Sequence, residues 1–395
     1  MRLIKSFSYT FISSMVFAIT QWLIISLIGH FLGIEKIGFY AFGLSLVIPV
    51  NIFFNFGVRQ IICSEKKVIN FHSYFIPIIS FQLLGLFLIT VICYFFYIDY
   101  LHLCILIYLI KISETITEIA YGLNQRVEKF DRIAYSKIAR SIISIIFFIT
   151  LISTTKNLYF AILAQCLSLY ICNIFFDYLP LENKNIFHLE KSKIYIIGFP
   201  LAIAGLLLSF KNMLPRFLIE NDASLESLGI FASITYLVSA GGLLITAISQ
   251  IIIPKVAQND NLKIKIKYIY TGFFLIIINI VISSLAIILL GDIIFNLLYG
   301  KSIKLTSLEY SFLILMFITT YISSYLGYMA SALRQLKKQP TIYIINIISM
   351  VILYFLFKNI LTPINSVYLT VILGGIQQIF FLYILVKKGL KPKVL

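Results

Sequence analysis

The chain has 395 residues, of which 60% are hydrophobic and only 12% are Asp, Glu, Lys or Arg. A soluble domain of ordinary composition carries about 25% of these charged residues, so this chain has too little polar surface to stay in water. Its formal net charge of +16 does not indicate nucleic-acid binding, because the basic residues lie in short segments between apolar runs. The composition therefore predicts an integral membrane protein with membrane lipids, and no nucleic acid, as partners.

The apolar residues form continuous runs that are long enough to cross a membrane as helices. A hydrocarbon core of about 30 Å needs roughly 20 apolar residues, and the runs do not alternate as barrel strands would. An all-α membrane protein with about twelve transmembrane helices is therefore expected. The predicted spans cover roughly residues 7–32, 37–62, 71–98, 100–122, 134–153, 157–179, 195–219, 228–252, 268–290, 308–333, 341–360 and 364–386.

The sequence indicates neither an enzyme nor a metal or cofactor site. The five cysteines form no CxxC pair, the four histidines are scattered, and there is no G-x-x-x-x-G-K-[ST] nucleotide-binding loop. The first run, 7–32, is too long for a signal-peptide core and has no A-x-A cleavage site, so it is expected to remain as a span. No catalytic residue, metal ligand or cofactor is predicted.

The distribution of Lys and Arg predicts which side of the membrane each loop faces. With the N-terminus in the cytoplasm, the inner segments and the inner span ends, Lys137 and Arg140 among them, carry 24 of the 32 basic residues. The outer loops and outer span ends carry five. Basic residues are retained on the cytoplasmic side, and an even number of spans returns the chain to that side. Both termini are therefore expected in the cytoplasm. The remaining basic residues, Lys111, Lys211 and Arg216, lie within spans.

A weak internal repeat relates the two halves of the chain. At an offset of 190 residues, Gln60-Ile61-Ile62 matches Gln250-Ile251-Ile252. The positions matched at an offset of 191 are Glu35, Gly38, Ala41, Leu46 and Val47 in the first copy and Glu226, Gly229, Ala232, Leu237 and Val238 in the second. The alternative is chance similarity between apolar helices. A true repeat predicts two parallel six-helix bundles around a central cleft, with residues 1–180 and 195–395 joined by a cytoplasmic linker at 181–194.

Several short motifs, together with the six-plus-six arrangement, resemble a known group of exporters. The motifs are Gly38-Phe39-Tyr40-Ala41, Gln125-Arg126, Gly198-Phe199-Pro200-Leu201, Pro215-Arg216-Phe217, Leu228-Gly229-Ile230-Phe231-Ala232 and Arg334-Gln335-Leu336-Lys337-Lys338. They resemble the polysaccharide flippases of the multidrug/oligosaccharidyl-lipid/polysaccharide exporter superfamily, and the resemblance covers essentially the whole chain. It implies a transporter that works by alternating access.

The resemblance also implies a substrate and a location. Such flippases translocate undecaprenyl-diphosphate-linked oligosaccharide repeat units across the bacterial inner membrane for O-antigen, capsule or related polysaccharides, where other polysaccharide-assembly membrane proteins are further candidate partners. A drug/cation antiporter of the same superfamily is an alternative, but it would favour Asp or Glu in the cores of the first and seventh spans, which contain none. A membrane polysaccharide polymerase is another, but it would favour a sizeable outer loop, and the outer loops are short.

Polar side chains inside the fourth predicted span are the first candidates for substrate binding. A charge at a helix centre costs about 2.5–3.5 kcal/mol on insertion scales, so such residues usually face a cavity or a partner. Lys111, Glu114 and Glu118 share one helix face through spacings of three, four and seven. They either line a polar cavity or form a structural ion pair with a neighbouring helix.

The seventh predicted span supplies Lys211, Asn212 and Arg216 as further candidates. Lys211 and Arg216 are expected to contact the diphosphate, with Arg216 the stronger anchor because a guanidinium can engage phosphate oxygens in a bidentate way. Alternatively, the Arg216 side chain extends to the membrane interface.

Three further polar residues have less specific patterns. Arg59, near the inner end of the second span, is either a positive-inside anchor or a binding residue. Gln21 in the first span corresponds to Asn212 at the offset of 191, and because amides often join helices, both are weaker cavity candidates. Asp177, near the inner end of the sixth span, is expected at the membrane interface.

Overall fold

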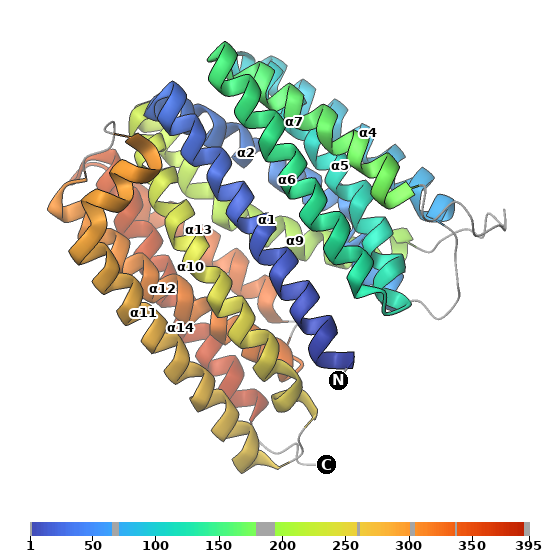
Figure 1. Cartoon of the computed structure of the whole chain (residues 1–395). Helices are drawn as coiled ribbons and strands as arrows, with labels where there is room; N and C mark the ends of the chain where they lie inside the picture. Colours follow the sequence, from blue (N-terminus) through green and yellow to red (C-terminus); the bar gives the residue numbers. More distant parts are fainter. Residues whose placement is uncertain are drawn as a thin grey trace. The chain divides into compact units, whose positions relative to one another are not determined.

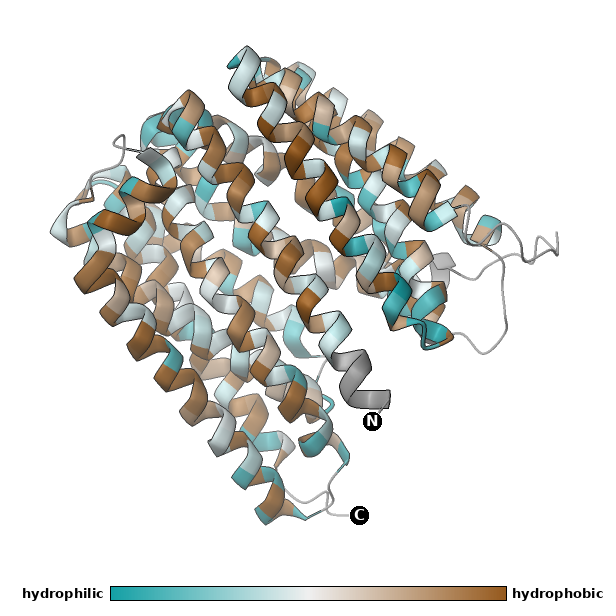
Figure 2. Ribbon diagram, in the orientation of Figure 1, coloured by the Kyte–Doolittle hydropathy of each residue, from teal (hydrophilic) through white to brown (hydrophobic). Residues whose placement is uncertain are grey.

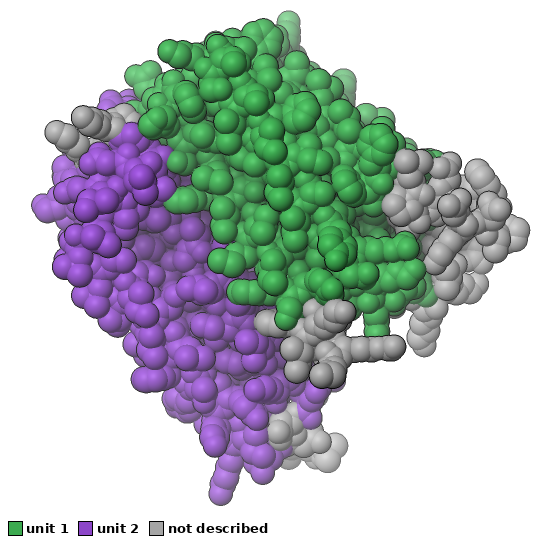
Figure 3. Space-filling view, in the orientation of Figure 1, with its two compact units in different colours: residues 1–213 green, residues 214–395 purple. Residues whose placement is uncertain are grey.

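The computed structural model describes residues 2–64, 71–178, 194–258, 261–300, 305–335 and 338–390, with the side chains of all but 2–7, 64 and 194–197. These residues are almost entirely helical and contain no strand, as Figure 1 shows. They group into two compact units, residues 1–213 and 214–395 (Figure 3). The division falls inside one helix, and the predicted linker at 181–194 lies, apart from Ile194, outside the described residues.

The described helices follow the order of the predicted spans. The first unit contains α1 (Arg2–Leu32), α2 (Ile34–Asn55), α3 (Val58–Ser64), α4 (Phe71–Phe96), the 3-10 turn η1 (Ile98–Tyr100), α5 (Leu101–Arg126), α6 (Phe130–Thr155), α7 (Leu158–Cys172), the π-helical segment η2 (Asn173–Tyr178) and the larger part of α9 (Ile194–Asp222). The second unit contains the end of α9, α10 (Leu225–Gln258), α11 (Leu262–Tyr299), α12 (Ser307–Ala332), α13 (Gln339–Phe357) and α14 (Pro363–Gly389).

The helices have the length and apolar character that crossing a membrane requires. Among the described residues, eleven helical segments are long and apolar enough to be spans. Helix α5 is also long, at 26 residues, but it carries Lys111, Glu114 and Glu118 near its middle. Figure 2 shows hydrophobic residues along most of the helix length and hydrophilic ones concentrated toward the helix ends. The prediction of an all-α membrane protein with about twelve spans is therefore confirmed.

Short connections with defined backbone geometry separate the helices. Gly33, the only residue between α1 and α2, has φ 88°, a conformation that glycine adopts without steric cost. The Asn157 side chain accepts a hydrogen bond of 2.9 Å from the Tyr159 amide at the start of α7. At the start of α12, Thr306 and Glu309 form a capping box. The Asn157 and Thr306 side chains each pair a backbone N–H group that the start of a helix leaves without a partner in the helix.

The first copy of the repeat contains a helix break that the second copy lacks. Helix α2 ends at Asn55, and Phe56 and Gly57 both have positive φ, 53° and 62°, before α3 begins. The corresponding segment of α10 is continuous. The repeat offset falls from 191 to 190 between Val47 and Gln60, so the first copy has one extra residue here. The break lies in the segment that contains this extra residue.

The last five spans of each half share a similar internal packing scheme. In the first unit the packed pairs include α2 with α4, α2 with α5, α4 with α5, α5 with α7 and α6 with α7. In the second unit the pairs at equivalent places in the span order are α10 with α11, α10 with α12, α11 with α12, α12 with α14 and α13 with α14. This agreement supports the internal repeat. The pseudo-two-fold relation between the units stays a prediction.

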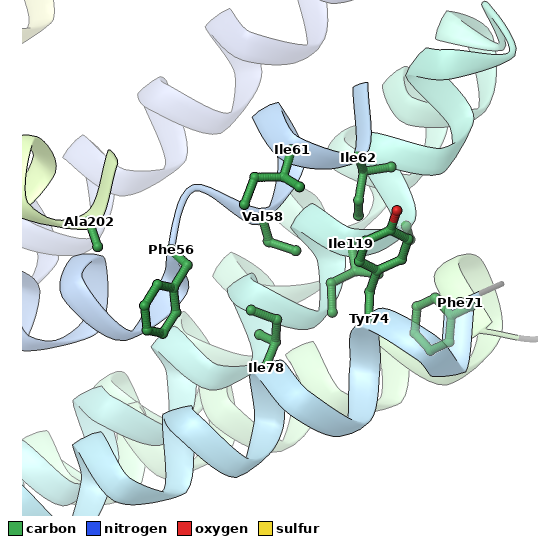
Figure 4. Close-up of a cluster of buried hydrophobic side chains, with 10 residues drawn as sticks. Phe56, Val58, Ile61, Ile62, Phe71, Tyr74, Ile78, Ile119 and Ala202 are labelled. Carbon is green, nitrogen blue, oxygen red and sulfur yellow. The ribbon is translucent and has the colours of Figure 1, made fainter. Parts of the chain in front are cut away.

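Helix α3 is held by a cluster of buried hydrophobic side chains (Figure 4). The cluster joins the break and α3 to α4, α5 and the start of α9. Its members are Phe56, Val58, Ile61, Ile62, Phe71, Tyr74, Ile78, Ile119, Ala120 and Ala202. Because a helix of seven residues is too short to be stable alone, this packing fixes its position and thereby that of Arg59.

Candidate functional site

A polar cavity of about 210 Å³ lies among five helices of the first unit. Its walls come from α1, α2, α5, α6 and α7. The residues that line it are Phe17, Gln21, Asn51, Asn55, Glu114, Thr115, Thr117, Glu118, Tyr121, Lys137, Arg140, Ser141, Ser144 and Leu169. Most of these side chains are charged or can form hydrogen bonds, which is unusual inside a bundle of apolar spans.

Helix α5 supplies the acidic part of the cavity wall. Glu114 and Glu118 lie one turn apart near the middle of the helix, so both point to the same side. Lys111 is set back from the lining and its Nζ lies 2.7 Å from Glu114 Oε2. The three residues therefore form a partly neutralised polar stripe, of which the two glutamates reach the cavity.

Arg59 connects α3 to this stripe. Its Nη1 lies 3.3 Å from Glu118 Oε2, and its Nε donates a hydrogen bond of 2.9 Å to Gln125 Oε1. The guanidinium carbon also lies 5.6 Å from the centroid of the Tyr121 ring. Arg59 thus has a specific set of partners on α5. Glu118 combines the two expected alternatives, because it lines the cavity and pairs with a neighbouring helix.

Helix α6 contributes two basic residues that sequence reasoning assigned to an inner, positively charged segment. Lys137 and Arg140 both line the cavity. Lys137 Nζ donates a hydrogen bond of 3.1 Å to Ser14 Oγ and lies 5.2 Å from the centroid of the Phe17 ring, both on α1. The sequence does contain a pattern that indicates this polar face. Its members have the spacing of one helix face within a predicted span: Lys137, Arg140, Ser141 and Ser144.

Arg140 forms a buried ion pair with Asp177. Its Nη1 lies 3.2 Å from Asp177 Oδ2, and both side chains are almost fully buried. Asp177 also accepts a hydrogen bond of 2.7 Å from Ser136 Oγ, and Arg140 Nη2 donates one of 3.4 Å to Ser113 Oγ. Asp177 is therefore buried inside the protein, and the partner that permits its burial comes from another helix. Its expected depth at the membrane interface stays a prediction.

Amide side chains of α2 form another part of the cavity wall. Asn51 Nδ2 donates to Gln82 Oε1 at 3.0 Å, and Asn55 Nδ2 donates to Thr115 Oγ1 at 3.2 Å. The Asn55 side-chain oxygen also accepts a hydrogen bond from the Val58 amide across the helix break. Gln21 reaches the cavity from α1 with its side chain half-buried, and makes no hydrogen bond to any described residue.

The remaining predicted site residues lie on α9 and do not line this cavity. Lys211 is half-buried and Asn212 is exposed. Arg216, in the second unit, is buried with 6% of its surface exposed, and its guanidinium carbon lies 5.1 Å from the centroid of the Tyr236 ring on α10. Arg216 therefore points toward a neighbouring helix. The structure brings Glu114, Glu118, Gln21 and Arg59 together, with Arg59 acting through Glu118.

The cavity is suited to binding a polar ligand by hydrogen bonds and charge. Among the described residues, no group of three or more His, Cys, Asp or Glu side chains is placed to hold a metal ion. The cavity carries acceptors on its carboxylates, donors on Lys137 and both kinds of group on Gln21. Apolar spans that enclose such a cavity are the features of a multi-pass membrane protein with an internal polar site.

Comparisons with known proteins identify the family. A family model described as "Polysaccharide biosynthesis protein" matches residues 3–260, and the chain belongs to this family. The capsular polysaccharide biosynthesis protein CapF of Staphylococcus aureus is 28% identical over 315 residues, which are 76% of this chain and 78% of the relative. The resemblance to polysaccharide exporters drawn from the sequence motifs is thereby confirmed.

Solved structures show which fold the chain adopts. The lipid II flippase MurJ, in an inward closed conformation, matches with a TM-score of 0.71 at 16% identity, covering 98% of this chain and 89% of that one. The MATE multidrug transporter DinF-BH matches with a TM-score of 0.68 at 13% identity, covering 98% of this chain and 95% of that one. At such identities the likeness establishes the shared fold.

Proposed function

We propose that the protein flips a lipid-linked oligosaccharide from the cytoplasmic to the outer leaflet of the bacterial inner membrane. The expected substrate is an undecaprenyl-diphosphate-linked repeat unit for O-antigen, capsule or a related polysaccharide. The observation that carries the proposal is a polar cavity inside the spans of a chain that belongs to a polysaccharide biosynthesis family. The proposed mechanism is alternating access of two six-helix bundles, residues 1–180 and 195–395.

The chemistry of such a substrate requires a path of this kind. A diphosphate and a sugar head carry charges and hydroxyl groups whose transfer into hydrocarbon is very unfavourable. Polar cavity walls replace the lost water contacts, while the polyprenyl tail can remain in lipid. Lys211 and Arg216 of α9 are the proposed ligands of the diphosphate.

The drug/cation antiporter alternative has no comparable support. The face of α1 that meets the cavity and Lys137 presents Ser14, Phe17 and Gln21, none of which is acidic. An antiporter that exchanges a cation for a drug would be expected to have a buried carboxylate on such a span.

Depletion of the protein in its own bacterium tests the proposed function. Depleted cells should lose surface polysaccharide and accumulate the lipid-linked oligosaccharide in a form protected from a periplasmic glycosidase. Wild-type protein should restore export, and Lys137→Met should restore it less than Lys156→Met, which alters an exposed lysine at the end of α6. Normal surface polysaccharide in depleted cells, or a change confined to drug susceptibility, would overturn the proposal.

A further inference from the structure

The charges around the first-unit cavity are almost completely compensated. Among the described residues that line it or pair with its lining, Arg59 pairs with Glu118, Lys111 with Glu114 and Arg140 with Asp177. Lys137 is left as the excess positive charge of this group, and it contacts Ser14 and Phe17. A diphosphate brings at least two negative charges, and here it would meet two carboxylates. The cavity is therefore poorly matched to the phosphate part of the proposed substrate.

The same side chains are well matched to a sugar. Sugar hydroxyl groups donate and accept hydrogen bonds at once, and the cavity offers carboxylate acceptors, the Lys137 ammonium donor and the Gln21 amide, which does both. The Phe17 and Tyr121 rings add apolar faces against which the C–H groups of a sugar ring can pack.

The size and rigidity of the cavity agree with this assignment. Its volume of about 210 Å³ lies below the roughly 300–1,000 Å³ of pockets for drug-sized ligands, which suits one sugar residue and not a whole repeat unit. The walls are held by internal bonds, including those of Asn51, Asn55 and Thr115. Because these internal bonds fix the positions of the walls, little further ordering is needed when the sugar binds.

We propose that the first-unit cavity binds one sugar residue of the translocated oligosaccharide and not its diphosphate. This inference rests on the proposed function. Gln21 and Lys137 are the proposed contacts, because both line the cavity and neither belongs to one of its three ion pairs. The site thereby separates recognition of the sugar from recognition of the lipid diphosphate.

Binding to the purified full-length protein tests the inference with two probes. One probe is the lipid-linked oligosaccharide extracted from the depleted strain, and the other is undecaprenyl diphosphate, which has no sugar. The wild type should bind the first more tightly. Gln21→Leu and Lys137→Met should each lower the affinity for the first probe by about tenfold, as expected for lost hydrogen bonds to a polar or charged group, and leave the second affinity unchanged.

The outcomes separate the inference from the function on which it rests. Lys156→Met should behave as the wild type with both probes. An unchanged affinity ratio in Gln21→Leu and Lys137→Met, with wild-type binding intact, would refute the sugar subsite alone. Equal losses for both probes in Lys137→Met would place the diphosphate in this cavity instead. If the wild type binds neither probe, the flippase proposal fails and the inference fails with it.

Discussion

At the scale of single residues, the Arg140–Asp177 pair is the most deeply buried charged feature of the described structure. Its groups are 3.2 Å apart, with 7% and 2% of their side-chain surfaces exposed. Removing one partner leaves an unpaired charge away from water, which costs about 3–5 kcal/mol. Arg140→Met should therefore lower the thermal unfolding temperature of the purified protein strongly, whereas Arg132→Met, at an exposed position of the same helix, should change it little.

A double variant shows whether the pair acts as a unit. Arg140→Met combined with Asp177→Leu removes both charges, so most of the lost stability should return. If each single variant unfolds at the temperature of Arg132→Met, the ion pair does not contribute as its burial suggests.

Arg216 allows the proposed diphosphate contact to be tested by a change that keeps the charge. A lysine lacks the planar fork that engages two phosphate oxygens, so Arg216→Lys should reduce surface polysaccharide by about tenfold at normal protein level. A role confined to the membrane interface predicts the opposite, because a lysine reaches the interface equally well. Wild-type amounts of polysaccharide in the Arg216→Lys strain would exclude the diphosphate assignment.

At the scale of helices, the break between α2 and α3 depends on close approach of α9. A Cβ atom at Gly198 would lie 2.8 Å from the Phe56 carbonyl oxygen, which belongs to the backbone and cannot rotate away. Gly198→Ala should therefore destabilise the protein by about 1–3 kcal/mol, the usual cost of overpacking. Thermal unfolding of the purified variant measures this effect.

Gly242 provides the matched control for that substitution. It also lies within a long helix, α10, but a Cβ atom there would meet nothing within 4 Å. Gly242→Ala should leave stability unchanged or raise it slightly, because alanine favours a helix over glycine. Equal unfolding temperatures for the two variants would mean that α9 does not pack tightly on the break.

At the scale of the whole molecule, the positive-inside pattern predicts that both termini face the cytoplasm. A cytoplasm-active reporter fused after Leu395 should give a signal, and an exported phosphatase fused at the same place should be inactive. A fusion within the outer connection at Lys156, between α6 and α7, should show the reverse pattern. Phosphatase activity at Leu395 would overturn the topology.

The positions of the spans along the chain could be predicted from the sequence because they depend on local properties. Hydropathy over about 20 residues locates a span regardless of its neighbours, and the motifs from Gly38 to Lys338 were sufficient to identify the family resemblance. The face shared by Lys111, Glu114 and Glu118 also followed from helix geometry alone. These features need only the chain's own periodicity and composition.

Other features depended on which helices meet, and only the tertiary structure decided them. Asp177 is buried because Arg140, 37 positions earlier in the sequence, is on the adjacent helix. Lys137 faces Ser14 across more than a hundred residues of chain, so a count of basic residues could not separate it from the loop lysines. Hydropathy locates a span, and spacing indicates which residues share a face of one helix. Whether a polar side chain is buried or exposed depends instead on its partners on other helices.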